Sequence, residues 1–449
     1  MTSTRKNVRE TAMDLLTAIE KNQSYSNLLL NKTIEKNQLP QKDIGLLTEL
    51  TYGTLQRRMA LDFFLQPFIK SNKKLENWVL HLLRLTLYQM VYLDKIPDRA
   101  AIFEAVEIAK KRGHKGISGM VNGVLRSIQR QGLPSLAEVA DSIERLSIET
   151  SHPKWLVERW VNQFGFEKTK EMCEVNLTVP MQTARVNRTK TTRADCISLL
   201  IDEGYQIEES SVIPDSIRAL KGNLASSKAF KDGLLSIQDE SSMLAAYALG
   251  AKEDEIVLDA CAAPGGKSTH IAERMGNSGE VVSLDLHEHK VKLINDNSKR
   301  LGLDNIKTIV MDSRQVGEHF EEESFDRVLL DAPCTGLGVM RRKPDMKYTK
   351  KEQDIFQLSS IQQNLLKSVS ALVKKGGVLV YSTCTVDKEE NENTVKVFLE
   401  NNPHFEEDDT FKNRMPEAIQ PLITGGFLQI FPQDFGSDGF FIACLRKKV

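Results

Sequence analysis

Hydrophobic residues near the N-terminus recur with the spacing of helices. One set is Val8, Ala12, Leu15, Leu16 and Ile19, and a second, in LENWVLHLLRLTLYQMVYLDKIP, is Trp78, Leu82, Leu85 and Tyr88. Positions three or four apart lie on one face of a helix, so each set predicts a helix with one buried side. A further helix, RAAIFEAVEIAKKRG, is expected to end at Gly113, because glycine favours helix C-termini. Residues 1–135 are therefore predicted to form an all-α bundle.

The helical pattern breaks near Gly132 and Pro134, in QRQGLPSLAEVADS. A smaller segment at 150–235 then combines stretches with the spacing of strands and a stretch with the spacing of a helix. MQTARVN and GLLSIQ are typical of strands, whereas TTRADCISLLIDEG has helical spacing. We expect a small α+β segment that links its neighbours or binds nucleic acid.

From residue 256 onward, predicted strands alternate with helices. The strands are EIVLDA, EVVSLD, IKTIVMD, FDRVLLDA and GGVLVYS, and the intervening helices include STHIAERM, HKVKLINDNSKRLG and a long one at about 352–374. This alternation predicts an α/β doubly wound parallel sheet at 236–449, with ligands at the carboxyl ends of the strands. GFLQIFP and DGFFIACL are predicted to close the sheet as an antiparallel hairpin.

Composition is that of an ordinary folded protein of several domains. The chain has 449 residues, of which 41% are hydrophobic and 27% charged. The first residues, MTSTRKNVRE, lack the apolar core of a secretory signal, and no apolar run approaches the roughly 18 residues of a membrane span. We expect a cytoplasmic protein without a membrane partner, and a monomer is favoured.

Charge is distributed unevenly along the chain. Residues 1–140 contain 21 Lys and Arg against 13 Asp and Glu, a net charge of +8, although the whole chain has a net charge of −1. A basic module suggests a polyanionic partner such as nucleic acid, and the basic turn AKKRGHKG at 109–116 is the candidate contact. Two solvated surfaces of unlike composition would give the same numbers.

The six cysteines contain no Cys-x-x-Cys pair, which argues against a zinc site and a disulfide framework. Two of them follow predicted strands at the ligand edge, Cys334 in LLDAPCTGLG and Cys384 in VLVYSTCT. These are candidates for chemistry. The remainder are expected to be inert buried residues: Cys173, Cys196, Cys261 and Cys444.

The loop after the first strand of this sheet, DACAAPGGKST at 259–269, allows three interpretations. Its tail matches a phosphate-binding Walker loop, but Cys261 replaces the first glycine and Pro264 removes a donor. The Gly-x-Gly-x-x-Gly fingerprint of dinucleotides is absent. The third interpretation is a glycine turn that lets backbone approach a nucleoside without phosphates, as in S-adenosylmethionine.

Strand-end carboxylates favour the third interpretation. Asp285, Asp312 and Asp331 each end a predicted strand at one edge of the sheet. They suit ribose hydroxyls, an adenine amino group and a sulfonium cation, and would repel a triphosphate. Any one of them alone is more often a helix cap or turn residue.

A methyl donor beside two thiols suggests methylation of a poorly nucleophilic carbon, and C5 of cytosine fits. A cysteine thiolate that adds at C6 makes C5 nucleophilic. The C5 proton must then leave before the thiol is expelled, which the second cysteine could assist.

Three motifs, DACAAPGGK, VLLDAPCTGLGVMRRKPD and VYSTCTVDKEENE, resemble those of RNA cytosine-C5 methyltransferases. The basic helical N-terminus resembles the NusB-like RNA-binding fold, which narrows the resemblance to the RsmB (Fmu/Sun) type, acting on 16S ribosomal RNA. The resemblance implies a Rossmann-like methyltransferase domain, with Cys384 as nucleophile, Cys334 resolving the adduct and Asp331 at the N3/N4 edge of the base. The implied S-adenosylmethionine site consists of Cys261, Ala262, Ala263, Pro264, Gly265, Gly266, Lys267, Asp285, Asp312 and Asp331.

The resemblance also implies that MRRKPD contacts phosphates near the site, through Arg341, Arg342 and Lys343. No metal is expected. The substrate could be free RNA or a partly assembled small subunit. Other classes stay open: an assembly factor with a vestigial nucleotide fold, or an NTPase that uses GGKS. An amino-group methyltransferase is disfavoured because it would want an aromatic residue in place of Cys334.

Overall fold

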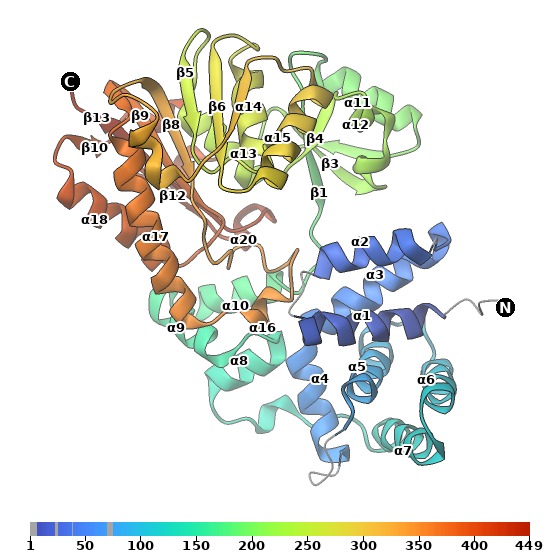
Figure 1. The fold of residues 1–449 in the computed structure, drawn as a ribbon. Coiled ribbons are helices and arrows are strands. Elements are labelled where there is room, and N and C mark those ends of the chain that lie inside the picture. The colour runs from blue at the N-terminus through green and yellow to red at the C-terminus, as the bar shows by residue number, and fades with distance from the viewer. Residues whose placement is uncertain (1–6, 23–25, 38, 70–74) are drawn as a thin grey trace. The chain divides into compact units, whose positions relative to one another are not determined.

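The computed structural model describes residues 7–22, 26–37, 39–69 and 75–449 (Figure 1). They pack into two compact units. The helical unit is Met1–Thr178 with Met340–Lys350, and the catalytic unit is Val179–Val339 with Lys351–Val449.

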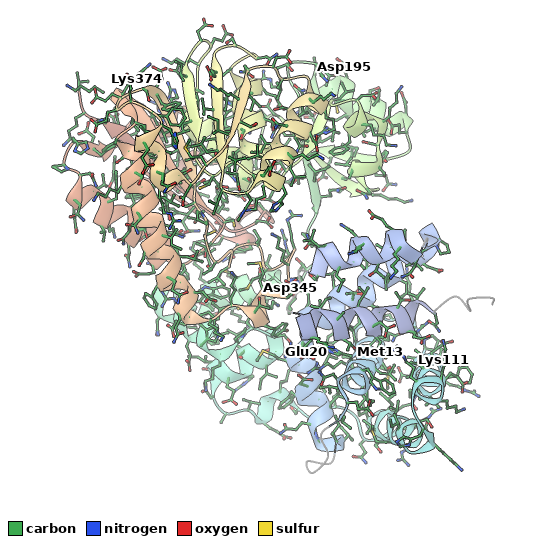
Figure 2. All side chains as sticks on the ribbon, in the orientation of Figure 1. Met13, Glu20, Lys111, Asp195, Asp345 and Lys374 are labelled. Atoms are coloured by element: carbon green, nitrogen blue, oxygen red, sulfur yellow. The ribbon has the colours of Figure 1, made fainter. Side chains whose placement is uncertain are left out.

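The helical unit confirms the predicted bundle. Its helices are α1 (Val8–Asn22), α2 (Ser26–Asn37), α3 (Gln41–Gln56), α4 (Arg58–Leu65), α5 (Asn77–Tyr92), α6 (Asp98–Arg112), α7 (Lys115–Gln131), α8 (Ser142–Thr150), α9 (Lys154–Phe164), α10 (Phe166–Val175) and α16 (Met346–Thr349). The predicted apolar faces of α1 and α5 lie in one core, in which Met13 of α1 is fully buried (Figure 2).

Two glycines end helices in different ways. Gly132 follows α7 at φ 79°, the left-handed conformation that favours glycine. Gly113 follows α6 as predicted, but its backbone is extended, with φ −122°. A Cβ at Gly113 would lie 3.0 Å from Ile117, so close packing against α7 accounts for the glycine there.

Residues 340–350 join the helical unit although they are remote from it in sequence. The Gln56 side chain donates to the carbonyls of Met340 and Arg341, at 3.4 and 3.0 Å. The Tyr348 hydroxyl donates to Leu55 O at 2.9 Å, and Lys347, fully buried, donates to backbone carbonyls. The segment is therefore an integral part of this unit.

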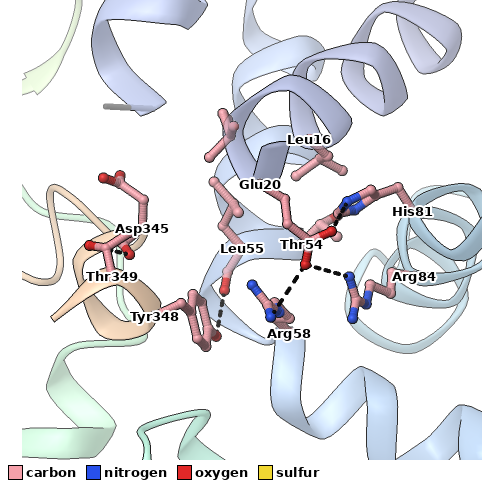
Figure 3. A pocket seen from close by; sticks show the side chains of 11 residues that line it. Leu16, Glu20, Thr54, Leu55, Arg58, His81, Arg84, Asp345, Tyr348 and Thr349 are labelled. Atoms are coloured by element: carbon pink, nitrogen blue, oxygen red, sulfur yellow. Dashed lines mark hydrogen bonds and ion pairs between the residues drawn. The ribbon is translucent and has the colours of Figure 1, made fainter. Parts of the chain in front are cut away.

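The same segment borders a pocket of about 180 Å³ in the helical unit (Figure 3). Inside it the Glu20 carboxylate faces three basic side chains: His81 at 2.9 Å, Arg58 at 3.4 Å and Arg84 at 3.9 Å. The hydrogen bond from His81 outweighs the effect of burial, so the pKa of Glu20 is lowered to about 2. Glu20 is therefore ionised throughout the physiological range.

The catalytic unit begins with a four-stranded antiparallel sheet in the order β2-β3-β1-β4. Its elements are β1 (Gln182–Val186), α11 (Arg193–Asp202), β2 (Gln206–Glu209), β3 (Ser216–Lys221), α12 (Lys228–Lys231) and β4 (Leu235–Ile237). The predicted strands β1 and β4 and the predicted helix α11 are confirmed, and β2 and β3 complete the sheet. Ala184 and Val186 pack with α11 in a small core, so the alternate positions of β1 point to the opposite face.

The large sheet of the same unit has the order β11-β12-β13-β9-β8-β5-β6-β7, with β10 paired to β13. Its strands are β5 (Ile256–Asp259), β6 (Glu280–Asp285), β7 (Ile306–Val310), β8 (Phe325–Asp331), β9 (Val373–Thr383), β10 (Phe405–Glu407), β11 (Ile423–Thr424), β12 (Phe427–Ile430) and β13 (Phe440–Lys447). The pairs from β9 to β7 are parallel, and β12 and β13 form the predicted antiparallel hairpin.

Helices cover both faces of this sheet, as the doubly wound prediction requires. They are α13 (Glu240–Leu249), α14 (Gly266–Arg274), α15 (Glu288–Leu301), α17 (Glu352–Ser370), α18 (Thr394–Asn401), α19 (Phe411–Arg414) and α20 (Pro432–Phe435). Successive residues of β5 enter different cores, Val257 with α13 and α14 and Leu258 with α17. Burial on both faces explains why these strands are continuously apolar in sequence.

The boundary after α17 differs from the prediction. The helix ends at Ser370 rather than near 374, and β9 begins at Val373, three residues before the predicted strand GGVLVYS. The pairing of β8 with β9 shifts register there, and Gly376 has φ 75°. The glycines therefore mark a bulge inside β9. None of the described helices is long and apolar enough to cross a membrane.

Candidate functional site

Two turns at the carboxyl ends of neighbouring strands bring the predicted cysteines together. Asp331, the last residue of β8, pairs with Ser382 of the parallel strand β9. Cys334 and Cys384 follow these positions closely, and their sulfur atoms lie 3.4 Å apart. Both side chains are half-buried. Adjacent parallel strands thus place two thiols side by side at the ligand edge of the sheet.

A buried carboxylate holds the Cys334 turn. Glu390, fully buried, accepts from the Thr335 backbone N–H at 2.8 Å and from the Thr335 hydroxyl at 2.7 Å. The Gln362 side chain donates to the carbonyl of Pro333 at 2.9 Å. The residues on both sides of Cys334 are therefore fixed. The sequence analysis missed Glu390, because DKEENEN has the composition of an exposed charged run.

The Cys384 turn is held through its backbone. Gly338 N–H donates to Cys384 O at 3.0 Å, and Gly439 N–H donates to Gly338 O at 2.9 Å. A Cβ at Gly338 would lie 2.1 Å from Gly439 O, so only glycine permits this approach. Asn391 donates to Thr385 O at 3.1 Å. Both cysteine turns are thus built on fixed elements.

An ion pair lies beside the thiols. Lys267 Nζ is 2.8 Å from Asp331 Oδ2, and the Ser382 hydroxyl donates to Asp331 Oδ1 at 2.8 Å. Burial by itself would lower the pKa of Lys267, but attraction to Asp331 and, more weakly, to Cys384 raises that pKa above its ordinary value. Lys267 is therefore a cation at neutral pH and favours negative charge on both partners.

Cys334 and Cys384 have different surroundings from the four cysteines that were expected to be inert. The hydrogen bond to Cys384, burial, and the charges of Glu390 and Asp331 raise the pKa of Cys334 well above its ordinary value. The four cysteines expected to be inert are buried or half-buried, and burial also raises their pKa values: to about 12 for Cys173 and Cys444, to about 11 for Cys196, and further for Cys261. None of these four is close to a second thiol in the described structure.

The predicted cofactor loop lies between β5 and α14. Ala262 N–H donates to Leu284 O, which ties the loop to β6, and Gly265 N–H donates to Ala262 O. Gly265 has φ 98°, and a Cβ there would lie 3.1 Å from Ile294 Cα of α15. No atom lies within 4 Å of the Cβ position at Gly266. A tight turn with open space above its second glycine fits the close approach of a nucleoside.

The strand-end carboxylates differ from one another. Asp285 ends β6 as predicted, is 8% exposed, and lies 3.8 Å from Lys290. Asp312 was predicted to end the third strand, but β7 ends at Val310 and Asp312 instead caps the following 3-10 helix. Its hydrogen bond from Arg314 lowers the pKa of Asp312. Asp312 has the capping role that the sequence analysis held to be commoner for a single aspartate, and it still lies at this edge.

Asp259 is a candidate site residue that the sequence analysis missed. It ends β5 and is fully buried, so the rule that selected the other aspartates would have found it. Its Oδ2 accepts from the Ser268 hydroxyl at 2.6 Å, whereas its Oδ1 has no hydrogen-bond partner among the described residues. Burial raises the pKa of Asp259 to about 7. A buried, incompletely bonded carboxyl beneath the loop fits a site built for a further polar group.

The two basic candidates for RNA contact are partly engaged within the helical unit. Arg341 of MRRKPD is buried, and Arg342 and Lys343 are half-buried. In the last turn of α6, which carries Lys111 (Figure 2), Lys111 lies 2.8 Å from Glu10, and Arg112 pairs with Asp14. The described residues contain no group of side chains arranged to hold a metal ion.

Known proteins with similar sequences cover all parts of the chain. Residues 6–130 match the NusB family, residues 152–224 the ferredoxin-like domain of RsmF/B-like methyltransferases, and residues 246–446 the family described as 16S rRNA methyltransferase RsmB/F. The probable ribosomal RNA small subunit methyltransferase B of Bacillus subtilis is 55% identical over 444 residues, 99% of each chain.

Solved structures are similar as well. The crystal structure of PH0851 has a TM-score of 0.82 at 27% identity and covers 98% of this chain and 99% of its own. NSun6 from Pyrococcus horikoshii, solved with SFG, has a TM-score of 0.59 at 26% identity and covers 66% of this chain and 98% of its own. The three matched families follow one another along the chain, the relative in Bacillus subtilis covers its whole length, and the chain belongs to the RsmB/F family of methyltransferases.

Proposed function

We propose that this chain transfers a methyl group from S-adenosylmethionine to C5 of one cytosine in 16S ribosomal RNA, through a covalent bond between Cys384 and C6 of the base. The observation that supports this most is the pair of thiols 3.4 Å apart beside the Lys267–Asp331 ion pair. A single reactive cysteine would serve many chemistries. Two at one edge suit a reaction that must both form and release an adduct.

The first step is addition of the Cys384 thiolate to C6, which makes C5 nucleophilic. The positive charge of Lys267 stabilises the thiolate, and the Lys267–Asp331 pair is the candidate to bond the N3/N4 edge, with Lys267 balancing the negative charge that develops there. When bound, S-adenosylmethionine supplies an electrophilic methyl group. C5 would then carry both the methyl group and its proton, and the demethylated donor would leave as a neutral thioether.

Release requires a base for the C5 proton, and Cys334 is the candidate. The largest cause of its raised pKa is the hydrogen bond to Cys384. Once the Cys384 sulfur is bonded to C6, it is no longer an anion that accepts this hydrogen bond. The pKa of Cys334 should then fall, at the stage of the reaction that needs a base. Removal of the C5 proton returns electrons toward C6, and the C6–S bond breaks to free Cys384.

The cofactor site is proposed at Cys261, Ala262, Ala263, Pro264, Gly265, Gly266, Lys267, Asp285, Asp312 and Asp331. Gly265 and Gly266 fit a nucleoside that approaches the backbone, and Asp285 fits ribose hydroxyls. NSun6, a structural relative, was solved with SFG, an analogue of S-adenosylmethionine. These observations support the donor, and Asp259 adds a buried acceptor beneath the loop.

We further propose that the chain has three domains: a NusB-like RNA-binding domain at 1–135, a small linker domain at 150–235, and a methyltransferase domain at 236–449. The matched families at 6–130, 152–224 and 246–446 support this division. The net charge of +8 over residues 1–140 supports RNA contact by the first domain. Action on ribosomal RNA would place the protein in the cytoplasm.

Covalent trapping tests the proposal. Cys384→Ala should abolish methylation and any covalent complex with 16S ribosomal RNA, because no adduct can form. Cys334→Ala should form the adduct and release it slowly, giving a protein–RNA band that survives denaturing electrophoresis. Cys196→Ala, a buried cysteine outside the site, is the matched control and should turn over normally. Normal turnover by Cys334→Ala, or a trapped band in Cys384→Ala, would contradict the assignment.

A further inference from the structure

The polar face of the small sheet is turned toward the cofactor-loop helix. In β1, Ala184 and Val186 face the small core, whereas Arg185 lies on the other face and its side chain is completely buried. An arginine is always charged, so burial requires acceptors around the guanidinium group. All of its recorded partners lie within the catalytic unit.

Arg185 bonds to both ends of α14. At the far end, Nε and Nη2 donate to the two carboxylate oxygens of Glu273, each at 2.8 Å. At the near end, Nη1 donates to Gly266 O at 3.0 Å and Nη2 to the Thr269 hydroxyl at 3.2 Å. Gln238 provides one more acceptor for Nη1. Gly266 is the first residue of α14, directly after the glycine turn, so one side chain fixes the helix and the end of the loop together.

Residues next to the strands of the small sheet also hold α15, the helix on the other side of the cofactor loop. Asn187 donates to Leu301 O at 3.0 Å, and Arg300 donates to Phe230 O at 2.7 Å. From within α15, Asn297 donates to the carbonyl of Pro264 in the loop at 3.0 Å. Both helices that flank residues 261–266 are thus held by residues of the small sheet and its turns.

We propose that Arg185 is a positioning residue for the S-adenosylmethionine site, and that the small sheet serves as a support for the cofactor loop. This rests on the proposed function, because it takes the loop at 261–267 as the donor site. Arg185 does not touch the donor: it acts through Gly266 and Thr269. The polar face of the sheet is consequently occupied by α14 and does not serve as an RNA platform.

A second ion pair on the same face, between a half-buried arginine and a buried glutamate, provides a matched control. Arg218 of β3 donates to Glu240 at 2.7 and 3.0 Å, and Glu240 is the first residue of α13. This pair also joins the small sheet to a helix that covers the large sheet. None of its hydrogen bonds among the described residues reaches the cofactor loop. If Arg185 only contributed stability, the two arginines would behave alike toward the donor.

The experiment compares Arg185→Lys with Arg218→Lys in the full chain, by calorimetry with S-adenosylmethionine and by filter binding with a 16S ribosomal RNA fragment. A lysine keeps the charge but has one point of contact in place of a fork. We expect Arg185→Lys to weaken S-adenosylmethionine binding about tenfold, the effect of about 1.4 kcal/mol, and to leave RNA affinity unchanged. Arg218→Lys should change neither affinity by more than about twofold.

Gln238→Met keeps the inference testable should Arg185→Lys not fold. It removes one acceptor and leaves the Arg185–Glu273 pair, and it should weaken S-adenosylmethionine binding about threefold. Equal losses in the Arg185 and Arg218 variants, or unchanged donor affinity in folded Arg185→Lys or Gln238→Met, would overturn the proposal. Failure of the unsubstituted chain to bind S-adenosylmethionine would instead contradict the proposed function.

Discussion

Each unit of the molecule has a fully buried cation, Lys347 in one and Arg185 in the other, that joins a remote segment to its core. In the catalytic unit, Arg185 has a carboxylate and several further acceptors. In the helical unit, Lys347 of the 340–350 segment has two carbonyls, Gln56 O and Thr150 O, both at 3.4 Å. No carboxylate among the described residues forms an ion pair with Lys347.

The difference has a consequence for charge. Arg185 remains ionised and fully bonded. Burial lowers the pKa of Lys347 to about 7, and the nearby charge of Arg57 acts in the same direction. A buried ion without a partner relieves its desolvation by losing a proton. In the catalytic unit, Arg185 therefore joins the segments through its hydrogen bonds at any pH. In the helical unit, Lys347 changes its charge near pH 7.

Replacing each cation by methionine should separate the two cases most strongly. Arg185→Met leaves Glu273 buried without its partner and should cost about 3–5 kcal/mol in the free energy of unfolding. Lys347→Met fills the same space without a charge and should be neutral or stabilising by about 1–2 kcal/mol at pH 7. Urea denaturation measures both.

The chain offers a convenient probe for this comparison. All three tryptophans, Trp78, Trp155 and Trp160, lie in the helical unit, so their fluorescence reports that unit, whereas circular dichroism reports both. A strong loss of stability in Lys347→Met would show that its two long hydrogen bonds matter more than its desolvation.

The pH dependence of the helical unit sharpens the comparison. The pKa of Lys347 is near 7 when folded and near 10.5 when unfolded, so the unfolded chain binds more protons between these values. Stability should therefore rise with pH from about 7 to about 10, by on the order of 4 kcal/mol, and the buried charge is fully unfavourable below pH 7.

Tryptophan fluorescence in urea at several pH values measures this dependence. Lys347→Met should remove most of the slope, whereas Arg185→Lys should leave it intact. Parallel slopes in Lys347→Met and the unsubstituted chain would assign the dependence to other groups, such as His152 or Cys173, which also interact with Lys347.

Donor binding should depend on the catalytic unit alone. Asp285→Ala is expected to weaken S-adenosylmethionine binding by roughly 1.5–3 kcal/mol, because a charged acceptor for hydroxyl groups is lost. Calorimetry with S-adenosylmethionine, and with ATP as a comparison, tests it. Tight binding of ATP without affinity for S-adenosylmethionine would favour the NTPase alternative.

RNA binding should depend on the helical unit, and here the expected effect is smallest. Replacing Lys110, Lys111, Arg112 and Lys115 by glutamine should flatten the dependence of RNA affinity on salt, without changing S-adenosylmethionine affinity. Because Lys110, Lys111 and Arg112 already pair with carboxylates, the log–log slope should fall by about one unit rather than four. Filter binding at several salt concentrations measures it.

The same substitution at Lys374 of the catalytic unit (Figure 2) is the control, since Lys374 pairs with Asp326 in that unit. An unchanged slope in the quadruple variant would move the RNA contact to Arg342 and Lys343 or to the small sheet's outer surface.

The sequence predicted the parts of the site that depend on local periodicity. Apolar runs identified the strands, and the rule that parallel strands share a ligand edge predicted that Cys334 and Cys384 would lie together. The sequence could not reveal the residues that hold the cysteine turns and the cofactor loop in place. Glu390 resembles a surface charge, and the partners of Arg185 are more than 50 residues away in sequence.

Boundaries that depend on tertiary packing were also beyond the sequence. Residues 340–350 follow a catalytic motif, yet they pack with helices some 200–300 residues earlier, through Gln56 and Tyr348. Gly376 and Gly377 open the predicted strand GGVLVYS, yet β9 begins at Val373, because the strand continues through a bulge at these glycines. Asp312 was predicted to end a strand, but the strand ends at Val310, and Asp312 caps the 3-10 helix that follows.

The central claim is methylation of one cytosine by way of Cys384, and bisulfite mapping of 16S ribosomal RNA tests it most directly. RNA from a deletion strain would be compared with RNA from the same strain carrying the unsubstituted chain or Cys384→Ala. We predict one cytosine that resists conversion with the unsubstituted chain and is converted in the deletion strain and with Cys384→Ala. A cytosine still protected with Cys384→Ala, or no difference between deletion and complemented strains, would contradict the account.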